Sequence, residues 1–318
     1  MARSRFHEQG GPQLAPDDGG ATTSGLHIPS TEETFNINDP QHRAMASARI
    51  ARFGMEYGKS HPDVLARGKQ WYDVAHQDIQ SLRGDIPMRT AAGLVSVVSG
   101  GSDWEKANKR VLEGVGSLEE SDWQDIRSST ASQYKQLATE RAAGKTTSKK
   151  AARHADISSM LAEKAPILSL SSNEQLIKAH SILRGADPES VLDPYSSPKT
   201  ARFYHGLLQP RHRDPGIAVD YRMADVVANQ MRGTGTERGL GTGHYKRPGR
   251  GLTSYQHHEQ LINEAGAQMQ ALGGRQFQGM GTPLRRQAAI WSMAKDYEMT
   301  HPEAKAGMGP VRRGQKYY

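Results

Sequence analysis

Residues 88–98, Met-Arg-Thr-Ala-Ala-Gly-Leu-Val-Ser-Val-Val, decide the fold class, because nearly all of their side chains are apolar or small. A helix of this composition is buried on all sides, so it must lie at the centre of other helices. Apolar residues also recur at helical spacing on both sides of it, and few stretches alternate with a period of two. The chain is therefore predicted to be all-α.

Further helices follow from the same spacing and from residues that start helices. Thr282 and Pro283 are typical of the N-cap and the first position of the last helix. The helix over 62–82 is expected to bury Leu65, Trp71, Tyr72, Ala75, Ile79 and Leu82. The predicted helices cover residues 40–59, 62–82, 88–98, 157–161, 173–183, 199–208, 220–231, 254–272 and those from 283 onward, with one more helix capped by Asp103.

The chain has 318 residues, of which 36% are hydrophobic, and this predicts one core with appendages. Residues 1–38 are rich in Gly, Pro and Ser without periodicity, so they are expected to form a disordered arm. The core then spans 39–231, and C-terminal helices over 252–300 pack on it before a basic tail over 301–318. The glycine-rich basic loop over 232–251 is either a flexible linker or a loop that grips phosphate.

The net charge of +7 favours a polyanionic partner such as nucleic acid, because clustered Lys and Arg gain affinity by releasing the counterions of phosphates. The same charge also fits a soluble protein that is merely basic. The absence of cysteine excludes disulfides, iron–sulfur clusters and thiolate zinc sites, and no cofactor is expected. No stretch approaches the roughly 18 apolar residues of a membrane span, so a soluble, cytoplasmic protein is expected.

Short motifs of other protein classes are incomplete in this chain. Gly144-Lys145-Thr146 resembles the end of a phosphate-binding P-loop, but Thr139 stands where that motif needs a glycine. The glycines of 233–243 lack the preceding buried strand of a dinucleotide-binding fingerprint. His257, His258 and Glu259 lack the spacing of a zinc-binding histidine pair and are expected on an exposed helix surface.

In residues 217–227, Ile-Ala-Val-Asp-Tyr-Arg-Met-Ala-Asp-Val-Val, an extended apolar run turns into a helix at Asp220. A carboxylate there suits a catalytic role and also an N-cap, which is worth about 1 kcal/mol. Lys199 lies at the start of an earlier helix and is either a reacting amine or a surface lysine. A lysine and an aspartate so arranged could do chemistry on a nucleobase. Four tryptophans are interpreted as core anchors rather than base-stacking platforms: Trp71, Trp104, Trp123 and Trp291.

Taken together, residues 91–228 resemble the helix-hairpin-helix DNA glycosylase superfamily. The run over 92–99, followed by Asn108 and Lys109, is similar to the family's apolar helix and serine turn before an Asn-Lys helix. Residues 176–183 look like the helix that leads into the hairpin. The remaining segments are Asp193-Pro194-Tyr195-Ser196-Ser197-Pro198-Lys199-Thr200-Ala201, which stands at the family's Leu-Pro-Gly-x-Gly-x-Lys-Thr-Ala, and Ala218-Val219-Asp220, which stands at its Val-Asp.

The flanking segments 68–72 and 287–291, Gly-Lys-Gln-Trp-Tyr and Gln-Ala-Ala-Ile-Trp, are similar to an uncharacterised family encoded by bacteriophages of actinobacteria. This second resemblance implies the host-cell cytoplasm or the virion as the location, and other phage proteins as partners that order the chain ends. The two resemblances imply an all-α protein with a helix-hairpin-helix glycosylase-like helical core, a disordered N-terminal arm and a C-terminal helical extension.

The glycosylase resemblance implies that Asp220 is the essential carboxylate, which stabilises the oxocarbenium-like sugar or activates the nucleophile. Lys199 matches the lysine that attacks the sugar in lyase-type members, a role that requires a neutral amine. The target base would be flipped out of the DNA. The residues expected to contact the DNA are Tyr195, Ser196, Ser197, Thr200, Arg222, Lys246, Arg247 and Arg250.

The chain departs from the family pattern at several positions. Tyr195 and Ser197 replace the hairpin glycines whose backbone amides approach a phosphate, Gly101 replaces an inserted glutamine, and Arg222 replaces a histidine. One interpretation is a DNA-binding enzyme that cleaves an N-glycosidic bond or modifies a base. The other is a catalytically inactive phage protein of the same fold that serves in DNA binding, packaging or virion structure. An unrelated helical bundle is a third alternative.

Overall fold

The computed structural model describes residues 39–98, 104, 110–143, 155–195, 197–212, 216–219 and 254–300. Within these ranges the regular structure is helical throughout, without strands, which confirms the predicted all-α class. None of the helices in these ranges has the length and hydropathy needed to cross a membrane. The predicted arm over 1–38, helix over 220–231, loop over 232–251 and tail over 301–318 lie outside the described residues.

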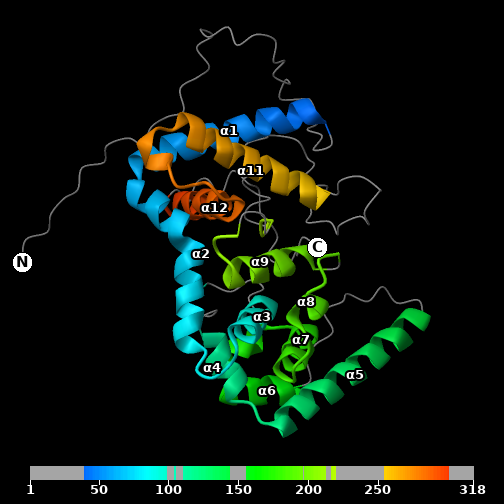
Figure 1. The fold of residues 1–318 in the computed structure, drawn as a ribbon. Helices are drawn as coiled ribbons and strands as arrows, with labels where there is room; N and C mark the ends of the chain where they lie inside the picture. The colour runs from blue at the N-terminus through cyan, green and yellow to red at the C-terminus, as the bar shows by residue number, and fades with distance from the viewer. Residues whose placement is uncertain are drawn as a thin grey trace, which may run out of the picture.

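Figure 1 shows how the helices follow one another in space. They are α1 (Pro40–Ser60), α2 (Pro62–Leu82), α3 (Met88–Val98), α4 (Val111–Gly116), α5 (Glu120–Ala142), α6 (Ala155–Lys164), α7 (Asn173–Leu183), α8 (Pro188–Val191), α9 (Pro198–Leu208), α11 (Ser254–Leu272) and α12 (Pro283–Thr300), with short 3-10 helices η2 (Pro166–Leu170) and η4 (Arg275–Phe277). Several begin at proline, which has no N–H to leave unpaired there. Asp39 caps α1, and Ser172 with Gln175 forms a capping box at α7.

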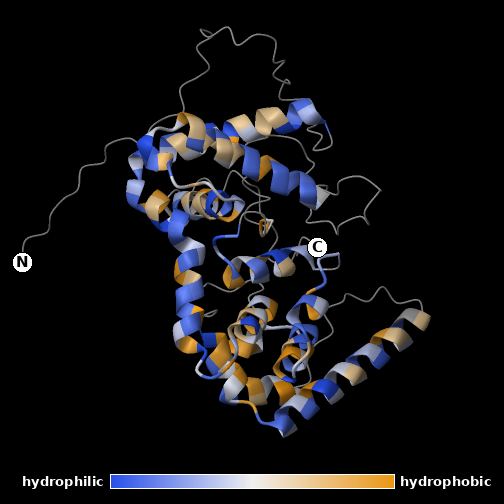
Figure 2. Cartoon of the chain, viewed as in Figure 1, coloured by the Kyte–Doolittle hydropathy of each residue, from blue (hydrophilic) through white to orange (hydrophobic). Residues whose placement is uncertain are grey.

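A middle lobe surrounds α3. It contains the second half of α2 and the helices from α3 to α9, and Leu284 and Ala288 of α12 also belong to its core. Every side chain of α3 from Ala91 to Val98 is buried, as its composition predicts. Hydrophobic residues gather at the foot of this lobe, around α4 and α6 (Figure 2).

An outer lobe joins segments that are far apart in the sequence. It contains α1, the first half of α2, residues 217–219, α11, η4 and most of α12. Its core includes Ile50 from α1, Ile262 from α11 and Ile290 from α12, all without solvent exposure. In Figure 1 it forms the upper part of the molecule, where the blue and orange helices lie against each other.

α2 belongs to both lobes. Leu65 lies in the outer core, whereas Tyr72 and Ile79 lie in the middle core. α12 packs along α2, and a Cβ added at Gly68 would lie 2.8 Å from the Cα of Ala289. A glycine at this point therefore lets the two helix backbones approach closely.

α5 leaves the middle lobe and projects from it, as Figure 1 shows. Near its first end Trp123 stacks on His180 of α7, with ring centroids 4.8 Å apart. Beyond Thr130 most of its side chains are exposed, and Tyr134 is 56% exposed. The sequence pattern predicts no helix there, because a mostly exposed segment carries no apolar stripe.

The structure shows that the expected exposure of Leu82, His257 and His258 is wrong. Leu82 is 40% exposed because it is the last residue of α2, where the chain turns toward α3. His257 and His258 are buried, at 7% and 1% exposure, because α11 packs on both α1 and α12. The segment predicted over 157–161 is a longer helix, α6. Asp103 lies outside the described residues, and α4 begins at Val111.

Candidate nucleic-acid interface

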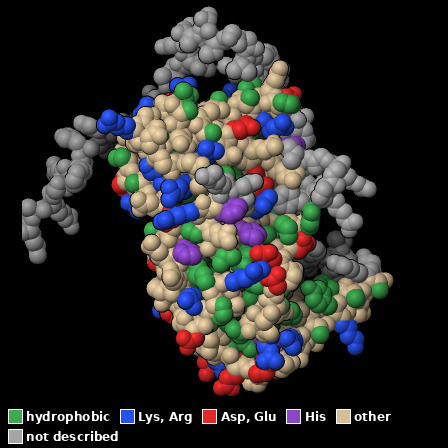
Figure 3. All heavy atoms as spheres, in the orientation of Figure 1, with side chains coloured by type: hydrophobic (Ala, Val, Ile, Leu, Met, Phe, Trp, Pro, Cys, Tyr) green, Lys and Arg blue, Asp and Glu red, His purple; other side chains and the backbone are tan. Residues whose placement is uncertain are grey.

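The two lobes meet along α9, and we call this boundary the seam. α9 packs on α3 and on α2. One face of α9 is turned toward the outer lobe, since Arg202 Nε donates to Glu259 of α11 at 3.1 Å. Lys199 shares that face, because residues three apart are neighbours on a helix. In Figure 3, histidine side chains gather at mid-height of the molecule with Lys and Arg beside them.

Lys199 is the second residue of α9 and is half-buried. Its ammonium group makes no hydrogen bond or ion pair with any residue that the structure describes. Thr200 beside it is also half-buried, and Ser197 at the N-cap makes no side-chain hydrogen bond to the first turn. The start of α9 therefore offers an amine and hydroxyl groups to a ligand at the seam.

The hairpin before α9 uses its own backbone donors. A carboxylate oxygen of Asp193 accepts the N–H of Tyr195 at 3.0 Å, and the Asp193 carbonyl accepts the N–H of Ser197 at 2.9 Å. These are the two positions where a glycine hairpin would present amides to a phosphate. Only their side chains are free to contact DNA here, and the Tyr195 side chain projects with 44% exposure.

Glu259 of α11 joins α9 to the segment that precedes Asp220. Its Oε1 accepts the Nε–H of Arg202 at 3.1 Å and the backbone N–H of Ile217 at 3.0 Å. The buried hydroxyl of Tyr255 donates to the Ile217 carbonyl at 3.0 Å and accepts the Val219 N–H at 2.9 Å. Tyr255 and Glu259 are one turn apart, so a single face of α11 holds this segment.

Gly216 begins the segment with a positive φ of 67°. A Cβ at this position would overlap the guanidinium of Arg202, so the chain passes directly against α9. Val219 is the covalent neighbour of Asp220 and is fully buried. The predicted residues that lie outside the described ones are Asp220, Ser196, Arg222, Lys246, Arg247 and Arg250.

An aromatic cluster lies on the same side of α9. The centroid of Trp71 is 5.2 Å from that of Trp104 and 6.0 Å from that of Phe203, which is one turn after Lys199. Trp104 and Trp123 are buried, as core anchors should be, whereas Trp71 and Phe203 are only partly buried. The members of the aromatic cluster are Trp71, Tyr72, Trp104, Phe203 and Trp291.

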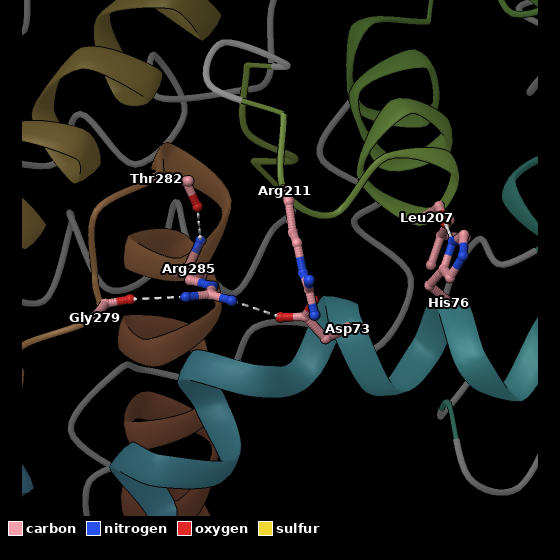
Figure 4. A network of polar contacts seen from close by, with 7 residues as sticks. All are labelled: Asp73, His76, Leu207, Arg211, Gly279, Thr282 and Arg285. Carbon is pink, nitrogen blue, oxygen red and sulfur yellow. Dashed lines mark hydrogen bonds and ion pairs between the residues drawn. The ribbon is translucent and has the colours of Figure 1, made fainter.

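The opposite end of α9 carries a charged network, drawn in Figure 4. Asp73 of α2 accepts the Nε–H of Arg211 at 3.0 Å with one oxygen and the Nη2–H of Arg285 at 3.0 Å with the other. Close by, His76 Nδ1 lies 2.8 Å from the Leu207 carbonyl and ties the end of α9 to α2. No motif or spacing in the sequence points to Asp73, Arg211 or Arg285 as site residues.

Two titratable groups on α9 stay uncharged at neutral pH. Burial lowers the pKa of the His205 imidazole, with Glu189 opposing this and Arg202 adding to it. Burial raises the pKa of the Tyr204 hydroxyl to about 12. The charge that α9 presents at the seam therefore comes from its Lys and Arg residues.

Within the described ranges, no group of three or more His, Asp and Glu side chains is arranged to hold a metal ion. No known protein family, curated protein or solved structure matches the chain.

Proposed function

We propose that the protein acts on a base in DNA at the seam, by N-glycosidic cleavage or a related modification, with Lys199 and Asp220 as reacting residues. One observation carries this proposal: Glu259 Oε1 binds both Arg202 of α9 and the backbone of Ile217. Lys199 begins α9, and Asp220 follows the short segment that starts at Ile217. One carboxylate thus supports both chain segments that supply the reacting residues.

The proposed chemistry uses the two residues in sequence. Asp220 first accepts a proton from the Lys199 ammonium group. The resulting neutral amine attacks the anomeric carbon of the deoxyribose, the bond from that carbon to the base breaks, and Asp220 passes its proton to the departing base. Its carboxylate also stabilises positive charge on the sugar. The sugar ring then opens to an imine with Lys199, which borohydride reduces to a stable amine.

The aromatic cluster supports the seam as the site where a base is held. Enzymes that act on bases take them out of the stack, and aromatic side chains bind such bases for roughly 1–3 kcal/mol each. Phe203 lies one turn from Lys199, and Phe203 and Trp71 are only partly buried. A base stacked on them would bring its sugar close to the start of α9.

The experiment is borohydride trapping with duplexes that contain an abasic site or one of a panel of damaged and modified bases. Wild type is compared with Lys199→Ala, Asp220→Asn and the control Lys178→Ala. Lys178 is a helical lysine of similar burial that pairs with Glu174, away from the seam. We expect a covalent adduct with wild type and with Lys178→Ala, and none with Lys199→Ala.

Asp220→Asn separates the two roles. We expect it to abolish base release while the protein unfolds at nearly the wild-type temperature. Base release by Lys199→Ala at the wild-type rate would remove Lys199 from the reaction and leave a hydrolytic mechanism through Asp220. An Asp220→Asn variant as active as wild type would overturn the proposed role of the aspartate.

A second candidate function is DNA binding without catalysis, as a packaging or virion component. The hairpin favours it, because Asp193 already occupies the two backbone donors that would bind phosphate. This alternative predicts that no duplex yields an adduct or a released base. It also predicts that the double variant Lys199→Ala, Asp220→Asn binds DNA as wild type does.

A further inference from the structure

We propose that the cluster of Lys69, Asp73, Arg211 and Arg285, called the Asp73 cluster, binds a backbone phosphate of the DNA whose base reaches Lys199. This inference rests on the proposed function for its ligand, and it names a contact that the glycosylase resemblance does not supply.

The Asp73 cluster has an excess of positive charge. Arg211 and Arg285 both pair with Asp73, and Lys69 lies near Arg285, so the three cations exceed the one carboxylate of the cluster by two charges. Both oxygens of Asp73 are already used, one by Arg211 and one by Arg285. Burial lowers the pKa of the Lys69 ammonium, and the nearby charge of Arg285 lowers it further, so these two cations repel each other. An anion bound between them would relieve that repulsion.

Arg211 is the member best placed to take the anion. Its side chain is 79% exposed, and only its Nε is bound, to Asp73. Its two Nη groups have no hydrogen-bond partner in the described part of the chain. Asp73 thus orients the guanidinium and leaves its outer edge open, the edge that binds phosphate oxygens in pairs.

The other two cations line the inner side of the cluster. Lys69 Nζ donates to the carbonyls of Gln276 and Gln278 at 2.7 and 3.2 Å, which holds it beside η4. Arg285 donates to Asp73, and its buried Nε has no hydrogen-bond partner among the described residues. Lys69 and Arg285 would hold a phosphate mainly through charge, and Arg211 through directed hydrogen bonds.

The length of α9 gives the approximate spacing between Lys199 and the end of the helix beside which the cluster lies. From Lys199 to Leu208 the helix rises about 14 Å, at about 1.5 Å per residue. A DNA strand rises about 3.4 Å per nucleotide, so this span corresponds to about four nucleotides. The hydrogen bond of His76 to the Leu207 carbonyl ties this end of α9 to α2 and holds the spacing. The predicted contact is therefore about four nucleotides from the target base.

The test is the salt dependence of DNA binding, measured by fluorescence anisotropy with an abasic-site duplex between about 50 and 200 mM KCl. Each phosphate contact contributes about −0.9 to the slope of log K against log salt. We expect Arg211→Gln to reduce the magnitude of that slope by about 1. The matched control is Arg67→Gln, because Arg67 is 67% exposed and also pairs with an aspartate, Asp63.

Two outcomes decide the matter. A slope reduced in Arg211→Gln and unchanged in Arg67→Gln supports the phosphate site. Equal slopes in both variants would overturn it and leave Asp73 as a link between helices only. Neither outcome depends on catalysis: wild type that does not bind the duplex would end the proposed function, whereas binding without Arg211 dependence would end only this inference.

Asp73→Asn is expected to change the affinity for DNA in the opposite direction. The amide keeps the shape of the side chain and removes the negative charge that competes with a phosphate. We expect this variant to bind the duplex several-fold more tightly at about 50 mM KCl. Unchanged or weaker binding by a variant that unfolds at the wild-type temperature would contradict the proposal. If Asp73→Asn does not fold, the Arg211→Gln slope decides alone.

The position of the contact can be mapped by ethylating single phosphates of the duplex. Ethylation about four nucleotides from the abasic site should weaken binding of wild type and leave binding of Arg211→Gln unchanged. Interference at that phosphate in both proteins to the same extent would assign the contact to another residue.

Discussion

The middle lobe takes its core from one continuous run of chain, from Tyr72 to Leu207, with two side chains added by α12. The outer lobe takes its core from segments at both sides of that run. Its contacts are correspondingly distant: the Tyr57 hydroxyl donates to Asp296 at 2.7 Å across 239 residues of sequence. The middle lobe is therefore held by contacts within one run of the chain, whereas the outer lobe is held by contacts between segments that are far apart in the sequence.

The two cores also differ in what fills them. The middle core surrounds α3 with small and branched residues and stacks His180 on Trp123. The outer core buries Met269, Met280 and Met293, and methionine fills irregular gaps because its side chain is unbranched and flexible. This difference indicates that the outer lobe tolerates small shifts more readily, while the middle lobe holds α9 in a fixed position.

The largest expected effect comes from truncating one core at a time. Leu94→Ala in α3 and Leu261→Ala in α11 each remove a fully buried side chain and should cost about 2–5 kcal/mol. Hydrogen exchange should then rise mainly in α3 and α7 for Leu94→Ala, and mainly in α1, α11 and α12 for Leu261→Ala. A uniform rise over both lobes in either variant would show that they unfold as one unit.

A smaller effect is expected where α2 and α12 approach. Gly68→Ala brings a Cβ to 2.8 Å from the Ala289 backbone and should cost about 1–3 kcal/mol in denaturant unfolding. The control is Gly116→Ala, where an added Cβ meets nothing within 4 Å. An unchanged unfolding midpoint in Gly68→Ala would mean that the two helices can separate freely at this point.

The next effect is confined to the middle lobe. Asp122 is buried, accepts the Glu119 N–H at 2.9 Å and pairs with Lys164 Nζ at 2.8 Å, so Asp122→Ala should cost about 1–3 kcal/mol. The hydrogen bond from Lys164 holds the pKa of the Asp122 carboxyl below its ordinary value. This stabilisation is therefore present above the ordinary pKa and is lost as the pH falls through the lowered one.

The control for Asp122 is an exposed ion pair of the outer lobe. Glu56 pairs with Arg52 one turn away on α1, and Glu56→Ala should change stability by less than about 0.5 kcal/mol. Urea unfolding of both variants at neutral pH makes the comparison. Equal losses would show that burial of Asp122 does not strengthen its contacts.

The smallest expected effect is a difference in acid sensitivity between the lobes. Burial lowers the pKa of His257 in the outer lobe, and Arg43 adds to this. Burial also lowers the pKa of His180, Arg127 adds to this, and Glu120 opposes it. As the pH falls through the ordinary value of 6.5, the unfolded chain binds protons first, so the free energy of unfolding decreases.

We therefore expect His257→Gln to flatten the decrease in stability between about pH 8 and pH 5.5 more than His180→Gln does. The reason is that Glu120 opposes the lowering of the His180 pKa. The measurement is the urea midpoint at both pH values. A larger flattening by His180→Gln would reverse the proposed order of the two lobes.

The helix boundaries could be predicted where local signals are strong. The predicted ends of α2, α3, α7 and α11 coincide with the structure. Pro62 sets the start of α2, and Ser172 caps α7, so these starts depend on residues within one turn. α5 was missed because its second half is mostly exposed and has no periodic apolar face.

Burial of polar residues could not be predicted from local patterns. His257 and His258 look like an exposed pair, but α11 packs between two helices and has no face left for solvent there. A helix buried on two sides loses the alternation from which exposure is inferred.

The candidate site was predictable only in part, for the same reason. Lys199 and Asp220 were singled out by their places at helix starts and by a resemblance, and their roles remain predictions. Glu259 could not be connected with them, because it contacts Arg202 and Ile217 across 57 and 42 residues. The pairs of Asp73 span 138 and 212 residues, and a lone aspartate on a helix gives no sign of either.

The way the outer lobe is assembled also has a consequence for synthesis on the ribosome. Tyr57 can bond to Asp296 only after synthesis of the chain has advanced by 239 residues. At about 5–20 residues per second this synthesis takes roughly 12 to 48 s. During this time α1 and the first half of α2 carry apolar faces with no partner, while the middle lobe can already fold. The nascent chain is therefore an expected client of chaperones at its N-terminal helices until the last of its helices has been made.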